Sequence, residues 1–195
     1  MNILEFIYNL FMNMINSAGI FAPILSSLLI FIESIVPVLP LSLFITINAV
    51  YLGSLTGFII SYVFTILGCY LSFKLCNNYL KKYYDKVLNK KEHKRIKKFM
   101  NGVNKLSLEK LTIVIAIPFT PAFLVNIACG FANVDEKKFA VSLFIGKIFL
   151  ILFWQFIGTS LIESIKNPLI LIKVIIMLVG AFIISKIINK KYRLE

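Results

Sequence analysis

The sequence predicts an all-α integral membrane protein made of two inverted repeats, each with a proline-containing re-entrant hairpin, plus a basic amphipathic cytoplasmic helix region. Two observations predict this class. First, 59% of the 195 residues are hydrophobic and the mean hydropathy is +0.88, which leaves too little polar surface for a soluble domain of this size. Second, two apolar stretches are each interrupted by a P-x-x-P pair, Pro37 with Pro40 and Pro118 with Pro121.

The second of these stretches, from Leu111 to Gly130, shows why a hairpin is expected. Proline removes a backbone donor and clashes with the preceding turn, and in hydrocarbon a freed carbonyl has no water to bond. The backbone is therefore predicted to break inside protein or beside a wet cavity, as re-entrant segments do. A kinked spanning helix is the alternative interpretation. Asn126 follows this break, as Asn48 follows the earlier one.

The two stretches also align with each other when the sequence is shifted by about 81 positions. The shift superposes five pairs: Pro37 with Pro118, Pro40 with Pro121, Ala49 with Gly130, Phe58 with Phe139, and Ser61 with Ser142. Asn48 and Asn126 do not superpose. Interrupted apolar segments at corresponding places in two halves of a chain point to the binding site of a transporter.

Two sets of residues, one around each proline pair, together resemble a known family. The first set is Phe31, Glu33, Pro37, Pro40, Gly53, Gly57 and Gly68. The second set is Pro118, Pro121, Asn126, Gly130, Phe139, Gly146 and Gly158. In this order, within a region from about Gly19 to Gly158, they resemble the two signatures of the DedA family of membrane proteins, also called the VTT or SNARE-associated domain.

The resemblance implies two opposed re-entrant hairpins and the transport or scrambling of lipids. The implied cargo in bacteria is undecaprenyl phosphate or a phospholipid, and coupling to the proton gradient is compatible with it. Two departures put the family's ordinary mechanism in doubt. Leu41 and Ser42 stand where the family often has an acidic residue after the first P-x-x-P, and Ile115 stands where many members have an arginine.

The predicted organisation is one membrane domain over residues 1–195. The first repeat covers 1–76 with a hairpin at about 20–50, the second covers 77–162 with a hairpin at about 106–138, and 163–195 form a C-terminal transmembrane helix and basic tail. Within these parts, helices are expected at 2–16 (amphipathic and interfacial), 51–73, 139–162 and 169–187.

Two ionisable residues lie within apolar sequence. Glu33 is the only acidic residue between Glu5 and Asp85; a charge at that depth is a functional hypothesis by default, and a solvated place at the headgroup boundary is the alternative. Lys147 lies about 12 Å along its predicted span, where it either snorkels to the interface or is a buried cation near the hairpins. We predict that Lys147 supplies the positive charge that Ile115 lacks, by pairing with Glu33 or by meeting a lipid phosphate.

The candidate site combines these residues with the helix breaks. The predicted substrate or proton pathway comprises Glu33, Pro37, Pro40, Asn48, Pro118, Pro121, Asn126 and Lys147. Small residues let helices approach closely in lipid, and the predicted packing glycines are Gly53, Gly57, Gly68, Gly130, Gly146 and Gly158. No cofactor, metal site or enzymatic activity is expected, because Cys69, Cys76 and Cys129 are not near a histidine in sequence and no phosphate-binding loop is present.

The segment 74–110 is the most basic part of the chain, with twelve Lys and Arg against three acidic residues. Its two apolar stripes flank a charged run around His93, which predicts a basic amphipathic region on an anionic leaflet. Nucleic-acid binding is disfavoured because the flanking apolar segments tether it to a membrane. Positive charge places 74–110 and the C-terminus in the cytoplasm of a multi-pass protein of the bacterial plasma membrane; the side of the N-terminus and oligomerisation stay open.

These features predict a lipid translocator for undecaprenyl phosphate or phospholipid, with membrane lipids as partners and anionic headgroups at 74–110. A small-ion or proton-coupled exchanger is an alternative from another transport class, for which more than one buried carboxylate would be expected, whereas only Glu33 is present. A membrane assembly protein without transport is the third alternative.

Overall fold

The computed structural model describes residues 17, 19, 21–36, 40–80, 100, 102–119, 122–165 and 167–192. Pro37, Pro121, the predicted helix at 2–16 and most of 74–110, including His93, lie outside the described residues. The elements of the described part are helices, with no strand among them, which confirms the all-α class.

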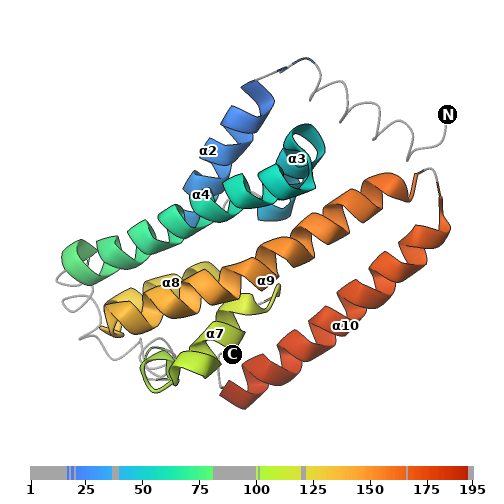
Figure 1. Cartoon of the computed structure of the whole chain (residues 1–195). Coiled ribbons are helices and arrows are strands. Elements are labelled where there is room, and N and C mark those ends of the chain that lie inside the picture. Colours follow the sequence, from blue (N-terminus) through green and yellow to red (C-terminus); the bar gives the residue numbers. More distant parts are fainter. Residues whose placement is uncertain are drawn as a thin grey trace.

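Eight helical elements follow one another along the described chain (Figure 1). They are α2 (Phe21–Ile35), α3 (Leu41–Leu52), α4 (Ser54–Lys74), the π-helix η1 (Leu75–Leu80), α7 (Leu108–Ala116), α8 (Ala122–Phe131), α9 (Glu136–Glu163) and α10 (Leu169–Tyr192). Three of these stretches are long and apolar enough to cross a membrane: Ser54–Tyr79, Glu136–Glu163 and Leu169–Lys191. Each overlaps a predicted span, and α10 continues through most of the expected basic tail.

Both predicted helix breaks are present, and local chemistry explains them. Proline disfavours helical backbone in the residue before it, so Ile117 is extended (φ −81°, ψ 127°) and α7 ends one residue earlier. Pro40 lies just before α3 as its N-cap residue. Gly53 separates α3 from α4 with a φ of +84°, a conformation that side-chain-bearing residues rarely adopt. This differs from the predicted packing role, because no atom of the described residues lies within 4 Å of where a Gly53 Cβ would stand.

The long helices α4 and α9 pack against each other in opposite directions. Gln155 Nε2 donates to the backbone oxygen of Ser54 at 2.9 Å, near the start of α4 and the end of α9. At the other end, Lys74 Nζ meets Glu136 Oε2 at 2.6 Å. We call these the Ser54 end and the Lys74 end of the bundle. Figure 1 shows α10 beside α9, at the edge of the bundle away from α4.

The pair α2–α3 enters the bundle from the Ser54 end. The Asn48 side chain of α3 bonds Ser27 of α2 and Ser61 of α4, and seven residues further along both helices Ser34 lies against Gly68. Helix α2 therefore runs in the direction of α4, and α3, which packs against α2, returns toward the Ser54 end.

The pair α7–α8 enters from the opposite end. Ser142 of α9 donates to the carbonyl of Leu108 at 3.1 Å, and one turn further Gly146 lies against Ile115. Helix α7 therefore runs with α9, away from the Lys74 end. Helix α8 returns to that end, where Gly130 contacts the carbonyl of Phe73.

The bundle is apolar outside and partly polar inside. Large hydrophobic side chains are exposed on its surface, such as Leu55 at 72% and Ile176 at 66%. Inside it, Asn48, Thr65 and Lys147 are at most 2% exposed. This arrangement suits a lipid surround, in which apolar side chains are well solvated and polar groups are drawn to the protein interior.

Glycines set the helix separations. A Cβ built on each of five glycines would come closer than 3.0 Å to a neighbouring atom, and these are Gly57, Gly68, Gly130, Gly146 and Gly158. A Cβ on Gly57 would stand 2.5 Å from the carbonyl oxygen of Asn48 in α3, and Gly158 faces the side chain of Thr46 in the same helix. Helix α3 therefore lies against both α4 and α9 at glycine contacts.

Candidate functional site

One face of α9 brings the two helix pairs together. Lys147, Trp154 and Gly158 follow at i, i+7 and i+11, which places them on the same side of a helix. Gly158 contacts Thr46 of the first pair. Trp154 meets Phe119, at the turn of the second pair, with ring centroids 5.8 Å apart. Lys147 therefore lies on the face of α9 that both pairs approach.

Lys147 is buried in the protein. Its side chain is 2% exposed, so it does not follow the alternative of snorkelling along the lipid face. Within the part of the chain that the structure describes, no hydrogen bond or ion pair ends on its ammonium group. Burying a cation without a direct counter-ion has a high free-energy cost, so the burial of Lys147 calls for a functional explanation.

Glu33 lies in the last turn of α2, next to the first helix break, and is half-buried. The Lys147 ammonium group acts electrostatically on the Glu33 carboxylate, so the two charges lie in each other's field. No direct ion pair joins them among the described residues. The structure thus brings together the two charges that the sequence analysis singled out, without contact between them.

Asn48 is engaged in hydrogen bonds inside the first pair. Ser26 Oγ donates to its Oδ1, and its Nδ2 donates to Ser27 Oγ at 3.4 Å and to Ser61 Oγ at 3.0 Å. All four residues are at most 4% exposed. This network ties α2, α3 and α4 together. The sequence analysis did not single out Ser26 and Ser27, although adjacent serines within an apolar helix were an available signal.

Asn126 is in the opposite situation. It is 1% exposed, and within the described part of the chain both its Nδ2 and its Oδ1 lack a hydrogen-bond partner. One turn further along α8, Gly130 contacts Phe73, so the stripe that carries Asn126 faces α4. Two further buried oxygens also lack partners among the residues that the structure describes, and they are Thr65 Oγ1 of α4 and Gln155 Oε1 of α9. The sequence analysis missed both of these residues, because an isolated Thr or Gln in an apolar helix gives no distinctive pattern.

The other predicted site residues lie at the breaks themselves. Pro40 is exposed, and Pro118 is half-buried in the turn after α7. Pro37 and Pro121 fall outside the described residues. Cys69, Cys76 and Cys129 are buried free thiols.

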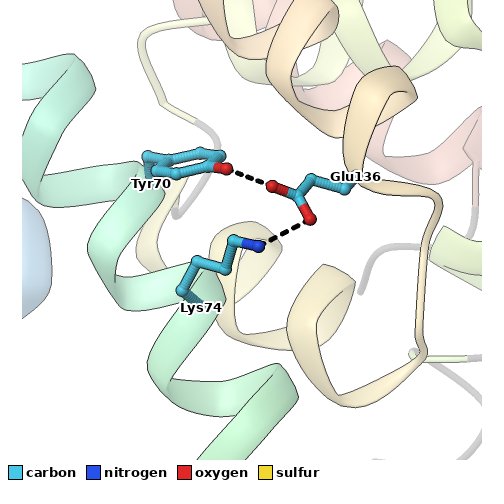
Figure 2. A network of polar contacts seen from close by, with 3 residues as sticks. All are labelled: Tyr70, Lys74 and Glu136. Carbon is cyan, nitrogen blue, oxygen red and sulfur yellow. Dashed lines mark hydrogen bonds and ion pairs between the residues drawn. The ribbon is translucent and has the colours of Figure 1, made fainter.

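A second polar cluster lies at the Lys74 end. Figure 2 shows Glu136, in the first turn of α9, accepting a hydrogen bond from Tyr70 and pairing with Lys74, both of α4. Asp135 caps the same helix, because its Oδ1 accepts from the backbone N–H of Lys138 at 2.8 Å. Helix α9 thus begins three residues before the expected 139–162, and the Glu136 contacts fix the end of α4 to α9.

The described part of the chain has three helices able to cross a membrane, an apolar exterior and two broken helix pairs. These features define a polytopic α-helical membrane protein. A family model of the VTT domain matches residues 36–160, about two thirds of the chain. The chain therefore belongs to the VTT-domain (DedA) family, as the resemblance implied. Helix α10 follows the matched region.

Two proteins of Bacillus subtilis (strain 168) are similar to the chain. The uncharacterized membrane protein YhjE is 26% identical over 171 residues, which cover 87% of this chain and 81% of that protein. The uncharacterized protein YqeD is 26% identical over 134 residues, which cover 69% of this chain and 64% of that protein. No solved structure is significantly similar to the chain.

Proposed function

We propose that this protein translocates a phosphate-bearing lipid, undecaprenyl phosphate or a phospholipid, across the membrane. The VTT-domain family is linked to membrane transport. The observation that carries the proposal is the buried Lys147, which lies near the ends of two opposed helix pairs and has no direct counter-ion among the described residues. A phosphate group would supply that counter-ion and would offer charge-assisted hydrogen bonds.

In this proposal the two helix pairs are re-entrant hairpins and the halves of the chain are inverted repeats. Their packing supports this, because α2 runs with α4 as α7 runs with α9, and because α3 contacts α9 as α8 contacts α4. Broken backbone within the membrane is tolerated where it is buried or lines a cavity. A path along the breaks lets the polar headgroup cross while the acyl chains stay in lipid.

Glu33 has the complementary role. When the site holds no phosphate, the Glu33 carboxylate partly offsets the charge of Lys147. When phosphate binds, the phosphate and the Glu33 carboxylate compete for the Lys147 ammonium group, which favours protonation of Glu33. This exchange would couple lipid movement to the proton gradient.

The proposed orientation places the Lys74 end in the cytoplasm. Described lysines gather there at the ends of several helices, and they are Lys74, Lys105, Lys110, Lys137, Lys138, Lys190 and Lys191. Cytoplasmic loops carry an excess of Lys and Arg, and such a surface attracts anionic headgroups. Together with 74–110 it would concentrate anionic lipid at the entrance of the path.

The test is lipid movement by the purified protein in proteoliposomes. Dye-labelled phospholipid and polyprenyl phosphate would be followed together with ion flux. Lys147→Met is expected to abolish lipid movement, whereas Lys173→Met, which removes an exposed lysine of α10, is the matched control and should leave it unchanged. Ion flux without lipid movement would support an exchanger. The absence of both activities would support an assembly protein.

A double-mutant cycle tests the coupling of the two charges. Glu33→Gln, Lys147→Met and the double variant would be compared in lipid transport and in thermal stability. Removing one member of an interacting pair leaves the other uncompensated, so the double variant should be more stable than the sum of the single losses predicts. Additive losses would reject the coupling of Glu33 with Lys147.

A further inference from the structure

Aromatic side chains lie on both sides of Lys147 along α9. On the Ser54 side, Phe119 meets Trp154 edge-on, with centroids 5.8 Å apart and an interplanar angle of 74°. Phe119 meets Phe182 of α10 in the same way, at 5.7 Å and 81°. We call these three residues the Ser54-side cluster. Trp154 is seven residues beyond Lys147 on the same face, about 10 Å along the helix.

On the Lys74 side, Phe73 of α4 stacks on Phe139 of α9. The centroids are 4.2 Å apart, the interplanar angle is 12°, and both side chains are fully buried. We call these two residues the Lys74-side pair. Phe139 precedes Lys147 by eight residues, about 12 Å along α9. Lys147 is thus enclosed between two aromatic contacts, each of which joins α9 to another helix.

One residue of each contact occupies corresponding positions of the two halves. The shift of about 81 positions that relates the proline pairs also places Phe73 on Trp154 and Phe58 on Phe139. Phe58 and Trp154, the positions that correspond to Phe139 and Phe73, pack against one apolar cluster. No ring contact joins these two residues in the described part of the chain. Trp154 instead holds Phe119. The closures at the two ends are therefore related by the repeat and differ in their partners.

We infer that the Ser54-side cluster and the Lys74-side pair are two gates that close the path to Lys147 from its two sides. The inference rests on the proposed function, because it takes Lys147 to lie on the path. Rings that meet edge-on or stacked gain about 0.5–1.5 kcal/mol beyond their buried area, which is small enough for one gate to open while the other stays closed. Phe182 is a positioning residue: through Phe119, it makes α10 part of the gate on the Ser54 side.

A reporter thiol tests this without any lipid transport. Lys147→Cys would be introduced in a chain whose native cysteines are replaced by alanine, and its reaction with a membrane-impermeant maleimide would be timed in vesicles of phosphatidylglycerol and phosphatidylethanolamine. The parent chain should react slowly. Phe119→Ala should raise the rate about threefold to tenfold, in line with the loss of ring contacts of this size. Phe182→Ala should raise it less, because Trp154 still holds Phe119.

Matched controls separate gating from loosened packing. Phe149→Ala in α9 and Ile183→Ala in α10 remove exposed side chains of the same two helices and should leave the rate unchanged. Phe119→Leu keeps an apolar side chain and carries the test if Phe119→Ala does not fold. Thermal unfolding of every variant shows whether a faster reaction merely follows lost stability.

Sidedness provides the decisive outcome. In vesicles of uniform orientation, Phe119→Ala should admit the reagent from one side and Phe139→Ala from the other. Labelling from the same side, a parent chain that already reacts fast, or folded variants that react at the parent rate would each overturn the two gates. Gated labelling without lipid movement would instead contradict the proposed function and leave the gates standing.

Discussion

The two broken helix pairs are built differently, although their sequences are alike. In the first pair, α2 and α3 pack closely, and Asn48 holds them to α4 through three serines. In the second pair, α7 and α8 touch each other little: α9 holds α7, and α4 and η1 hold α8. Asn126 there is equally buried, yet neither of its polar side-chain atoms has a hydrogen-bond partner in the part of the chain that the structure describes.

This difference suggests a division of labour. A hydrogen-bonded network in a low-dielectric interior is rigid and costly to break. An unpaired buried amide costs about 1–3 kcal/mol, and a static fold gains nothing from it. The first pair is therefore interpreted as a scaffold, and the second as the part that has hydrogen-bonding capacity left for a ligand or a moving segment.

The largest expected effect breaks the comparison at the two asparagines. Asn48→Leu should lower the free energy of unfolding by about 2–3 kcal/mol, because it leaves buried serine hydroxyls without their amide partner. Asn126→Leu should change it by less than about 0.5 kcal/mol or raise it, because its amide is already unpaired. Chemical denaturation in detergent, followed by circular dichroism, measures both. Equal losses, or a larger loss at Asn126, would contradict the difference between the pairs.

A smaller effect is expected at the glycine contacts. Gly57→Ala pushes a methyl group toward the carbonyl of Asn48 in the fixed first pair, whereas Gly130→Ala pushes one toward Phe73 and Cys76 in the loosely joined second pair. Overpacking costs about 1–3 kcal/mol. Both changes should lie in the lower half of that range, and Gly57→Ala should cost more because hydrogen bonds hold α3 in place. Thermal unfolding measures both, with Gly180→Ala as the control in open space. The comparison would need revision if Gly130→Ala proved the costlier change.

The smallest effect concerns the ion pair at the end from which the second pair enters. Glu136→Gln removes the contact with Lys74, whose side chain is 33% exposed, while that of Glu136 is 43% exposed. Pairs with such access to solvent contribute little to stability, and salt screens them. Glu109→Gln is the matched control, because Glu109 also lies in the first turn of a helix. Unfolding at low and at high salt should show a loss for Glu136→Gln that exceeds the loss for the control.

The sequence by itself determined the class of the protein and the positions of its breaks. Composition determined the all-α membrane fold, because a helix satisfies the backbone hydrogen bonds within its own segment and can therefore lie in lipid. Prolines fixed the interruptions, because their effect acts on the adjacent residues: α7 ends just before Pro118, and Pro40 caps α3. The family signatures around these prolines could also be recognised from the sequence, and the match to the VTT domain agrees with them.

The tertiary structure decided what the polar residues do. Asn48 and Asn126 look alike in the sequence. In the described part of the chain, however, Asn48 bonds serines of two other helices, whereas Asn126 has no hydrogen-bond partner. From its depth in the span alone, Lys147 could either snorkel to the interface or be buried. The packing of the helix pairs around one face of α9 buries it. Phe182, beyond the matched region, gained a partner only because α10 folds back along α9. Hydrogen-bond satisfaction and burial depend on which helices meet, and no local pattern in the chain contains that information.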